Sequence, residues 1–485
     1  MEQKYIFAAI LLVGSGFAGI LLATFSQRIR DVFFFLMVTV SAMTERFDVN
    51  FFGREWYRGT TYGVEISIVD VFAISVLISM LLRPGVGERR WFWPASLGTM
   101  VLFLLFSAVC VAAADPRLYG YYALSKIVRG ITIFLAAALY IRGERELKLF
   151  LLALAAIVCY EGLIAIEQRY RFGIHRVFSD FNAANSLSMY CCLTAPVFVA
   201  ALNSRLPRYI KLASVAALGL AALAVVMTIS RAGIVTFALV LIGVTAATVS
   251  WRITARKIVV SMVVLAATVA IIGKSWETLG SRFTEASLEE EYENRYSQGR
   301  GYYIRVALAI VEENWFGVGP NNWSYWVSNK YGPRLGFKFA PYPGTDRMPK
   351  FEVAADANVD DPQAAPAHNL AALTLGEMGY GGLVLMIVMW MRWFQMGAVF
   401  LWKRTPDPMR RIGVGIFFGT WGIFLQSITE WVFWQTAIYF TFHIMLGVLA
   451  SLYFQRKKAV RAEREARRIA EESVELAPPA PALNL

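Results

Sequence analysis

The sequence predicts an all-α polytopic membrane protein of about 12–14 transmembrane helices with one large loop on the non-cytoplasmic side. Of its 485 residues, 57% are hydrophobic and only 17% are charged, which excludes an ordinary soluble globular chain. The apolar residues fall in blocks of about 20, the length that crosses a bilayer as a helix. Lys and Arg concentrate in the short segments between these blocks.

Residues 1–273 are predicted to form about ten of these helices. The first block is followed by no small-residue cleavage site, so we interpret it as a span rather than as a removed signal peptide. The block Asp31–Met43 is short for a span, which leaves the total open by one or two. Typical blocks are Tyr5–Phe25, Trp93–Ala113, Leu147–Ile166, Leu212–Ile229 and Ile234–Ser250.

The basic segments orient the chain. If they face the cytoplasm, the N-terminus lies outside and the C-terminus inside, and the helices alternate consistently. The short basic loop Arg169–Arg176 then falls outside, against the rule. The net charge of +12 is explained by these orientation signals and by attraction to anionic membrane lipids, so we expect no nucleic-acid partner.

Residues 274–367 form the one long polar segment, which this orientation places in the periplasm. Its many aromatic residues favour a folded, functional loop over a disordered one. We expect an acidic helical stretch at Glu285–Glu293, an amphipathic helix at Tyr302–Asn314 and a turn at Gly317–Asn322. The last part, Ala354–Ala367, is rich in Ala, Asp and Pro and is expected to be extended or mobile.

Residues 368–455 are predicted to form the C-terminal transmembrane helices. Within them, Met391–Trp402 is either an interfacial helix or the end of a span. The tail, residues 456–485, faces the cytoplasm in this topology. It begins as a charged helix, in which Glu463 and Arg467 are spaced for an ion pair, and ends in a Pro/Ala-rich segment expected to be disordered.

Histidine is scarce, with three residues in the chain. His443 lies in an apolar run and is interpreted as a core residue bonded to a neighbouring helix, and His175 lies in a basic loop and is interpreted as solvated. His368 lies where the long loop meets the next helix. A neutral imidazole there suits a general base, whereas a helix-capping position without chemistry is an equally open interpretation.

Several charged residues occupy unusual places. Glu377 lies inside a span, where it is either functional or a structural ion-pair partner. Arg231 lies in a tight turn on the outer face, where it binds a phosphate or extends to the membrane interface. Arg300 and Arg305 flank a helix start, where they reach one pocket or are simply solvated.

The sequence lacks the motifs that are typical of nucleotide-binding and metal-binding sites. The glycine-rich stretch Gly317–Asn321 has no P-loop lysine, which argues against a nucleotide site. The four cysteines lie in apolar blocks without metal-ligand spacing. The outer loops hold no paired acidic motif for a divalent cation, so we expect a metal-independent reaction without a cofactor.

An ordered set of short motifs resembles the O-antigen ligase and polymerase superfamily of bacterial inner-membrane polysaccharide proteins. The resemblance extends from about Phe178 to Gly382, and the preceding spans match by hydropathy alone. Its motifs are Asn182-Ala183-Ala184-Asn185, Ser230-Arg231-Ala232-Gly233, Gly299-Arg300, Trp315 to Asn322, His368-Asn369 and Glu377-x-Gly379-x-x-Gly382. The segment Ala354–Ala367 and the extended basic tail depart from the family pattern.

The resemblance implies a fold similar to type C glycosyltransferases and transfer of a glycan from a polyprenyl diphosphate carrier to an acceptor hydroxyl. It implies that His368 activates or orients the acceptor, and that Arg231 and Arg300 hold the diphosphate. It further implies a substrate-binding region that contains Arg305, Asn369, Glu377, Asn185, Trp315 and Trp323. The tryptophans, with Trp326, either stack on sugars or form the core of the loop.

Within this interpretation, a ligase that uses lipid A-core as acceptor is slightly favoured over a polymerase that uses another lipid-linked glycan. A polysaccharide flippase is the alternative from another class. It predicts internal repeats, charges deep in several spans and short outer loops, none of which dominates here. A scaffold of an export complex is a third interpretation, under which substitution of His368 leaves activity intact.

Overall fold

The computed structural model describes residues 2–83, 91–249, 300–337, 339–345, 363–402 and 406–475. Seven helices in these ranges are long and apolar enough to cross a membrane, and three further apolar helices are shorter. The predicted all-α polytopic class is therefore confirmed. The total of about 12–14 spans remains a prediction, because residues 250–299 lie outside the described ranges.

The N-terminal helices enclose a small hairpin that the all-α prediction omitted. Helices α1 (Glu2–Phe25), α2 (Gln27–Val40) and α4 (Ile68–Leu82) pack on one another. Between α2 and α4 come α3 (Thr44–Phe47) and the antiparallel strands β1 (Asp48–Phe51) and β2 (Val64–Ser67), which pair Asp48 with Ser67. Both strands alternate polar and apolar residues, but four residues each are too few to distinguish a strand from a chance pattern, which is why the sequence did not reveal them.

The remaining long helices form the main bundle, with α8 packed between α9, α10 and α18, and α6 packed along α19. Their buried side chains join one continuous apolar core. The helices are α5 (Leu97–Ala113), α6 (Leu118–Tyr140), α7 (Glu144–Tyr170), α8 (Ala184–Leu202), α9 (Arg208–Thr228), α10 (Arg231–Thr248), α17 (Leu370–Ala398), α18 (Met409–Ser427) and α19 (Thr436–Glu475).

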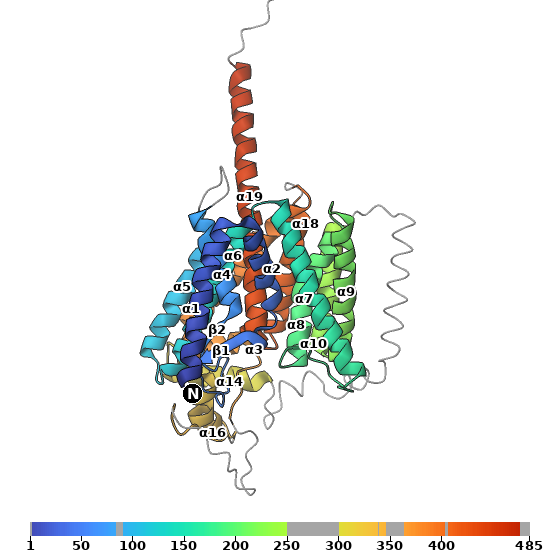
Figure 1. Ribbon diagram of the computed structural model, residues 1–485. Coiled ribbons are helices and arrows are strands. Elements are labelled where there is room, and N and C mark those ends of the chain that lie inside the picture. The colour runs from blue at the N-terminus through green and yellow to red at the C-terminus, as the bar shows by residue number, and fades with distance from the viewer. Residues whose placement is uncertain are drawn as a thin grey trace, which may run out of the picture.

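The described part of the long loop folds against one end of this bundle. It contains α14 (Arg300–Glu313), α15 (Trp323–Trp326), a π-helical turn (Val327–Tyr331) and α16 (Gly332–Arg334), around an apolar core of its own. Helices α14 and α16 lie at the same end as the N-terminus, and α19 projects from the opposite end (Figure 1). Helix α14 confirms the predicted amphipathic helix.

The acidic stretch predicted at Glu285–Glu293 lies outside the described residues, as does most of Ala354–Ala367. The predicted turn Gly317–Asn322 is present, and Asn321 at its centre has a φ of 61°. The Asn321 side-chain amide donates to the carbonyls of Thr61 (2.9 Å) and Tyr119 (3.1 Å). The turn therefore joins the loop to the β1–β2 connection and to α6.

The same turn forms hydrogen bonds to α17 at a break in that helix. Gly379 has a φ of 63°, which interrupts the helix. The break frees upstream carbonyls, because a helical carbonyl normally accepts from the residue four positions later. The Val318 amide donates to the carbonyl of Gly376 (3.0 Å), and the Gly319 amide to that of Glu377 (2.8 Å). The loop thus replaces hydrogen bonds that α17 loses at the break.

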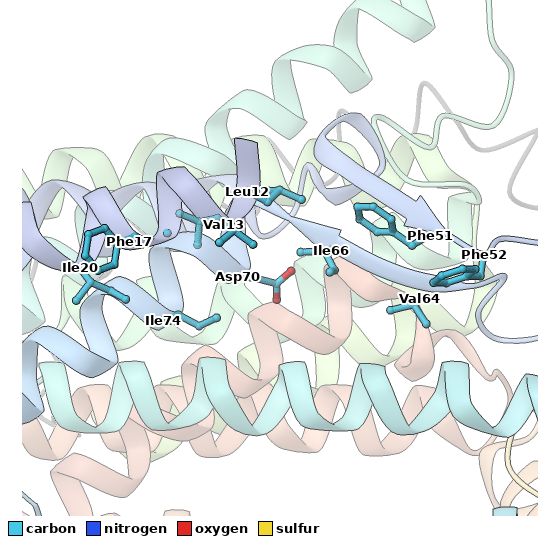
Figure 2. Close-up of a pocket in the computed structure, with 12 residues that line it drawn as sticks. Leu12, Val13, Phe17, Ile20, Phe51, Phe52, Val64, Ile66, Asp70 and Ile74 are labelled. Atoms are coloured by element: carbon cyan, nitrogen blue, oxygen red, sulfur yellow. The ribbon is translucent and has the colours of Figure 1, made fainter. Parts of the chain in front are cut away.

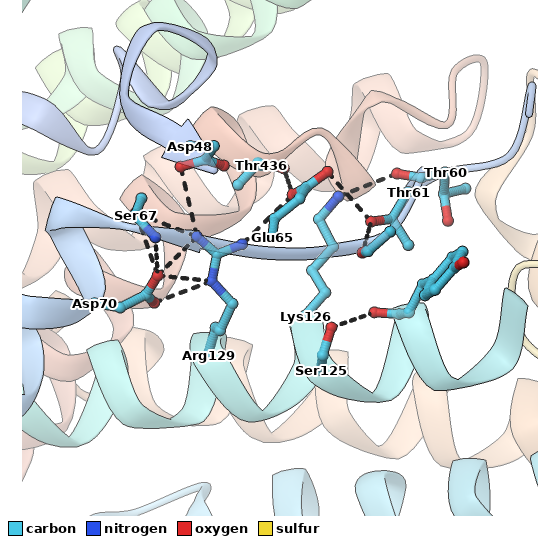
Figure 3. Close-up of polar contacts among 12 residues, drawn as sticks. Asp48, Thr60, Thr61, Glu65, Ser67, Asp70, Ser125, Lys126, Arg129 and Thr436 are labelled. Atoms are coloured by element: carbon cyan, nitrogen blue, oxygen red, sulfur yellow. Dashed lines mark hydrogen bonds and ion pairs between the residues drawn. The ribbon is translucent and has the colours of Figure 1, made fainter. Parts of the chain in front are cut away.

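A buried ion cluster fixes the hairpin to the bundle (Figure 3). Arg129 of α6 contacts Asp70 (2.8 Å), Glu65 (3.4 Å) and Asp48 (3.6 Å). Thr436, the first residue of α19, donates to Glu65 (3.2 Å). Burial raises the pKa of Asp48 to about 7, although Arg129 opposes this shift. The cluster therefore connects the hairpin, α4, α6 and α19.

The structure also resolves details of the C-terminal part. Met391–Trp402 is mainly the end of α17, and the charged start of the tail continues α19 without interruption to Glu475. His443 is buried, but its Nδ1 lies 2.7 Å from the carbonyl of Tyr439 in its own helix. The expected bond to a neighbouring helix is therefore wrong, since the carbonyl four residues earlier is the closer partner.

Candidate functional site

A polar cavity of about 190 Å³ lies among residues at helix ends and in connecting segments. It lies where the starts of α8 and α10 meet the segment between α18 and α19. Its lining residues are Arg176, Asn185, Ile229, Ser230, Arg231, Ala232, Gln426 and Glu430. Two arginines, one carboxylate and two amides therefore face one small volume.

The turn between α9 and α10 places Arg231 in the cavity wall. Ile229 ends α9 in the left-handed region (φ 53°), and Ser230 then caps α10 by accepting a hydrogen bond from the Gly233 amide (3.3 Å). A Cβ at Gly233 would lie 2.5 Å from Ser188 Oγ, so this glycine permits close packing of α10 on α8. The Ser-Arg-x-Gly turn thus presents Arg231 at a helix N-terminus.

Arg176 supplies a second guanidinium from the basic loop that the predicted topology places outside. Its Nε donates to the carbonyl of Thr228 (3.3 Å), and its Nη2 to the side-chain oxygen of Asn185 (3.4 Å). Two guanidinium groups and the N-terminus of α10 all favour an anion. The cavity is therefore suited to phosphate oxygens.

His368 borders the cavity through Glu430. The His368 Nδ1 lies 2.6 Å from Glu430 Oε2, and Glu430 Oε1 accepts a hydrogen bond from the Asn185 amide (2.6 Å). The N-cap of α17 is Asn369, which accepts from the Ala372 amide (2.9 Å). Because Asn369 performs the capping, the interpretation of His368 as the capping residue does not hold.

Helix α14 approaches the site from the loop. The ring of Tyr303 lies 5.7 Å from the ring of His368. Arg300 begins α14, three residues before Tyr303. Arg305 is two residues from Tyr303, on the opposite face of the helix, and is exposed. The structure therefore places Tyr303 of α14 beside His368 and Arg305 on the opposite face of that helix.

A comparison with protein families finds a match in this part of the chain. Residues 216–387 match the family described as O-antigen ligase. We call this segment the O-antigen ligase domain, after the family that it matches. The match confirms the resemblance to the O-antigen ligase and polymerase superfamily, and together with the apolar helices it indicates a multi-pass membrane protein. A comparison of the chain with curated proteins finds no match.

The O-antigen ligase domain contains Arg231, Arg300 and His368, whereas Asn185, Arg176 and Glu430 lie outside the matched segment. The sequence did not identify Glu430, Arg176 or Gln426 as site residues. Arg176 carried the same signal as Arg231, an arginine on the outer side of the predicted topology. The signal for Glu430 was a carboxylate between two apolar blocks at that same end.

Other predicted residues connect the loop of the O-antigen ligase domain to α17. The Glu377 side chain is buried and accepts a hydrogen bond from the Trp323 amide (3.3 Å). Trp323 is 1% exposed, and a Cβ at Gly376 would lie 2.6 Å from its ring. Trp323 is therefore part of the loop core, and in this conformation neither face of its ring is open to a sugar.

Trp315 is 68% exposed, and its ring lies 5.3 Å from the ring of Tyr380, beyond the break in α17. Along α17, Tyr380 is separated from His368 by about 18 Å at 1.5 Å per residue. The structure thus groups Arg231, His368, Asn369 and Asn185 at one site. It places Trp315 elsewhere.

A larger cavity of about 590 Å³ lies between α1, the hairpin and α4 (Figure 2). Its lining is almost wholly apolar, and none of the predicted site residues contributes to it. Asp70 lies in its wall, but the Asp70 carboxylate already accepts hydrogen bonds from Arg129 and Ser67. The polar cavity therefore remains the candidate site.

The described residues provide no cluster of metal ligands. Within those ranges, no group of three or more His, Cys, Asp or Glu side chains is placed to hold a metal ion. The groups that could neutralise a phosphate in the cavity are the guanidiniums of Arg176 and Arg231. The expected metal independence remains a prediction for experiment.

Proposed function

We propose that the protein is a membrane glycosyltransferase that moves a glycan from a polyprenyl diphosphate-linked donor to an acceptor hydroxyl. One observation carries the proposal: two arginines and a histidine–carboxylate pair meet at one cavity, and Arg231 and His368 belong to the O-antigen ligase domain. The proposed setting is a bacterial inner membrane with the cavity facing the periplasm and the C-terminus in the cytoplasm, as the positive-inside pattern favours.

The donor diphosphate would occupy the arginine side of the cavity. Arg231 and Arg176 would contact phosphate oxygens, with Arg300 approaching from α14. These charges stabilise the diphosphate as it leaves, which is the electrostatic contribution that a divalent cation makes in other enzymes. At about 190 Å³, the cavity is smaller than the ~300–1,000 Å³ typical of drug-sized ligand sites. A diphosphate suits this volume better than a glycan, which would extend outside.

His368 would act on the acceptor. Its Nδ1 is engaged by Glu430, so Nε2 is the nitrogen left to accept the proton of the acceptor hydroxyl. The acceptor oxygen then forms a bond to the anomeric carbon of the donor sugar. The bond from that carbon to the phosphate oxygen breaks, and the electron pair leaves with the diphosphate. Anionic membrane lipids would surround the basic cytoplasmic segments.

The transporter alternative is less consistent with the pattern of charges. It predicts charged residues deep in several spans that are available to a substrate. The deep cluster around Arg129 is instead paired internally, with Asp70, Glu65 and Asp48 as its partners. The charges that line the polar cavity lie at one end of the bundle. This distribution favours chemistry at one membrane face.

The test is glycan transfer by the purified protein in detergent with EDTA, using a lipid-linked oligosaccharide donor. Acceptors are lipid A-core or a second molecule of donor. We expect transfer by the wild type, and loss of about 10²–10⁴-fold in His368→Ala because a general base contributes on that scale. Arg231→Ala should also lose activity, whereas the exposed Arg305→Ala serves as the matched control.

The acceptor that works decides between a ligase and a polymerase, which share the donor chemistry. Inert wild type with both acceptors, or full activity in the His368→Ala variant, would refute the proposal. Either result would favour the transporter or the scaffold. Activity that EDTA abolishes and Mg²⁺ restores would refute the metal-independent part alone.

A further inference from the structure

We infer that Glu430 is a positioning residue for His368, and that a hydrogen-bonded chain from Arg176 through Asn185 holds Glu430 in place. The inference rests on the proposed function, because it assigns the group that orients the proposed base. Glu430 lies in the segment between α18 and α19, outside the O-antigen ligase domain match. The orientation of His368 thus depends on a distant part of the chain.

The hydrogen-bond pattern fixes the arrangement of donors and acceptors. Asn185 must turn its oxygen toward Arg176, because a guanidinium only donates, and the distance is 3.4 Å. Its amide nitrogen therefore faces Glu430 Oε1 at 2.6 Å and donates to it. Both oxygens of an ionised Glu430 then accept, one from Asn185 and the other from His368 Nδ1–H at 2.6 Å.

This pattern selects one tautomer of the imidazole. With the proton on Nδ1, the Nε2 lone pair is available to accept a proton, which the opposite tautomer could not do. The Glu430 side chain is 8% exposed and that of His368 is 40% exposed. The orienting bond is therefore largely shielded from water, whereas the imidazole still reaches the outside.

A second contact supports the same segment. The Asn369 side-chain amide donates to the carbonyl of Ile428 at 3.0 Å. Consecutive residues at the start of α17, His368 and Asn369, thus hold the segment that carries Glu430 at two points. The hydrogen-bonded chain also connects Arg176 to His368. The proposed donor and acceptor would therefore contact the two ends of one hydrogen-bond network.

Two variants test this network by exchanging hydrogen-bond donors and acceptors at positions 430 and 185. In Glu430→Gln, the single side-chain oxygen accepts from Asn185, so the amide nitrogen faces His368 Nδ1 and donates to it. This bond favours the Nε2–H tautomer, although the shape of the side chain is retained. In Glu430→Gln with Asn185→Asp, the carboxylate moves to residue 185 and accepts from both Arg176 and the new amide. The glutamine oxygen is then free to accept from His368 Nδ1–H. Glu167→Gln, which changes a partly exposed carboxylate near the C-terminal end of α7, is the control.

Two readouts separate this inference from the proposed function. The first is the ¹⁵N NMR spectrum of histidine-labelled full-length protein, in which only three histidines contribute and His368→Ala assigns the signal. We expect the Nδ1–H tautomer in the wild type, a shift toward Nε2–H in Glu430→Gln, and recovery in the double variant. Thermal stability of each variant verifies folding.

The second readout is transfer kinetics. In Glu430→Gln we expect kcat to fall by roughly 10- to 10⁴-fold with little change in the donor KM, and partial recovery in the double variant. An unchanged tautomer together with an unchanged kcat would overturn the inference. A wild type without transfer activity would refute the proposed function, while the tautomer shift would still decide whether Glu430 orients His368.

Discussion

At the scale of single residues, the proposed contact with the diphosphate of the glycan donor depends on the geometry of Arg231. Arg231 begins α10, and the cap formed by Ser230 fixes its backbone. A guanidinium offers planar, paired donors that fit two phosphate oxygens, whereas an ammonium offers a point charge. Shape as well as charge should therefore matter at this position.

We predict that Arg231→Lys lowers transfer by about 10-fold and Arg231→Ala by about 100-fold or more, mainly through a raised KM for the donor. The lysine retains the charge but loses the paired hydrogen bonds. Initial rates over a range of donor concentrations measure the effect. Equal activity of the lysine variant and the wild type would exclude paired recognition.

Asp48 provides a prediction about pH. Its pKa is raised to about 7 in the folded state by burial, above the ordinary value of 3.8. The native protein therefore binds more protons than the unfolded chain between these values, and the stability contribution present at low pH is lost as the pH rises toward about 7. Asp48→Asn cannot titrate and should flatten this dependence.

The measurement is thermal unfolding in detergent at pH 5 and pH 8. The wild type should lose on the order of 2 kcal/mol more than Asp48→Asn over this interval, since one pKa unit corresponds to about 1.4 kcal/mol. Identical pH dependence of the two proteins would show that Asp48 does not titrate as described.

At the scale of elements, the break in α17 determines how the loop attaches. Gly379 has a positive φ, and a Cβ there would lie 2.0 Å from the Trp315 carbonyl oxygen. The break frees carbonyls that then accept the amides of Val318 and Gly319. The conformation of one glycine thus places the loop, and with it α14, next to His368.

We predict that Gly379→Ala destabilises the protein by about 2–4 kcal/mol, because the new Cβ adds a steric clash to an unfavourable left-handed conformation. Gly219→Ala in α9 is the control, since a Cβ at Gly219 would meet no neighbouring atom within 4 Å. That change should be neutral or slightly stabilising. Thermal unfolding of both variants measures the difference, and equal stability would contradict the clash.

At the scale of the whole molecule, the ion cluster around Arg129 joins the N-terminal helices to the main bundle. The Arg129 side chain is 9% exposed, and its removal would leave Asp48, Glu65 and Asp70 close together without their cation. A buried carboxylate without its partner is costly, although the intact pair adds little net stability.

We predict that Arg129→Met destabilises the protein by about 3–5 kcal/mol. Arg145→Met is the control, because Arg145 is 61% exposed and its ion pair with Asp31 should contribute about 0–1 kcal/mol. The midpoint of thermal unfolding in detergent compares the two variants. A similar loss in both would show that the cluster has no special role.

The sequence by itself determined the membrane class, the first described helix of the long loop and the turn that follows it. Apolar blocks of spanning length and left-handed turn residues are local signals, so they can be read without a structure. The sequence also indicated Arg231, because the predicted topology places this arginine at the outer end of a span, against the charge rule.

Only the tertiary structure decided which of the indicated residues meet. Arg176, Asn185, Arg231 and Glu430 come from four separate parts of the chain, and their proximity depends on how α8, α10, α18 and the loops pack. Burial likewise decided that Trp323 belongs to the core of the loop. Spacing along the chain carries no information on distances between helices, and it therefore could not reveal the Glu430–His368 pair.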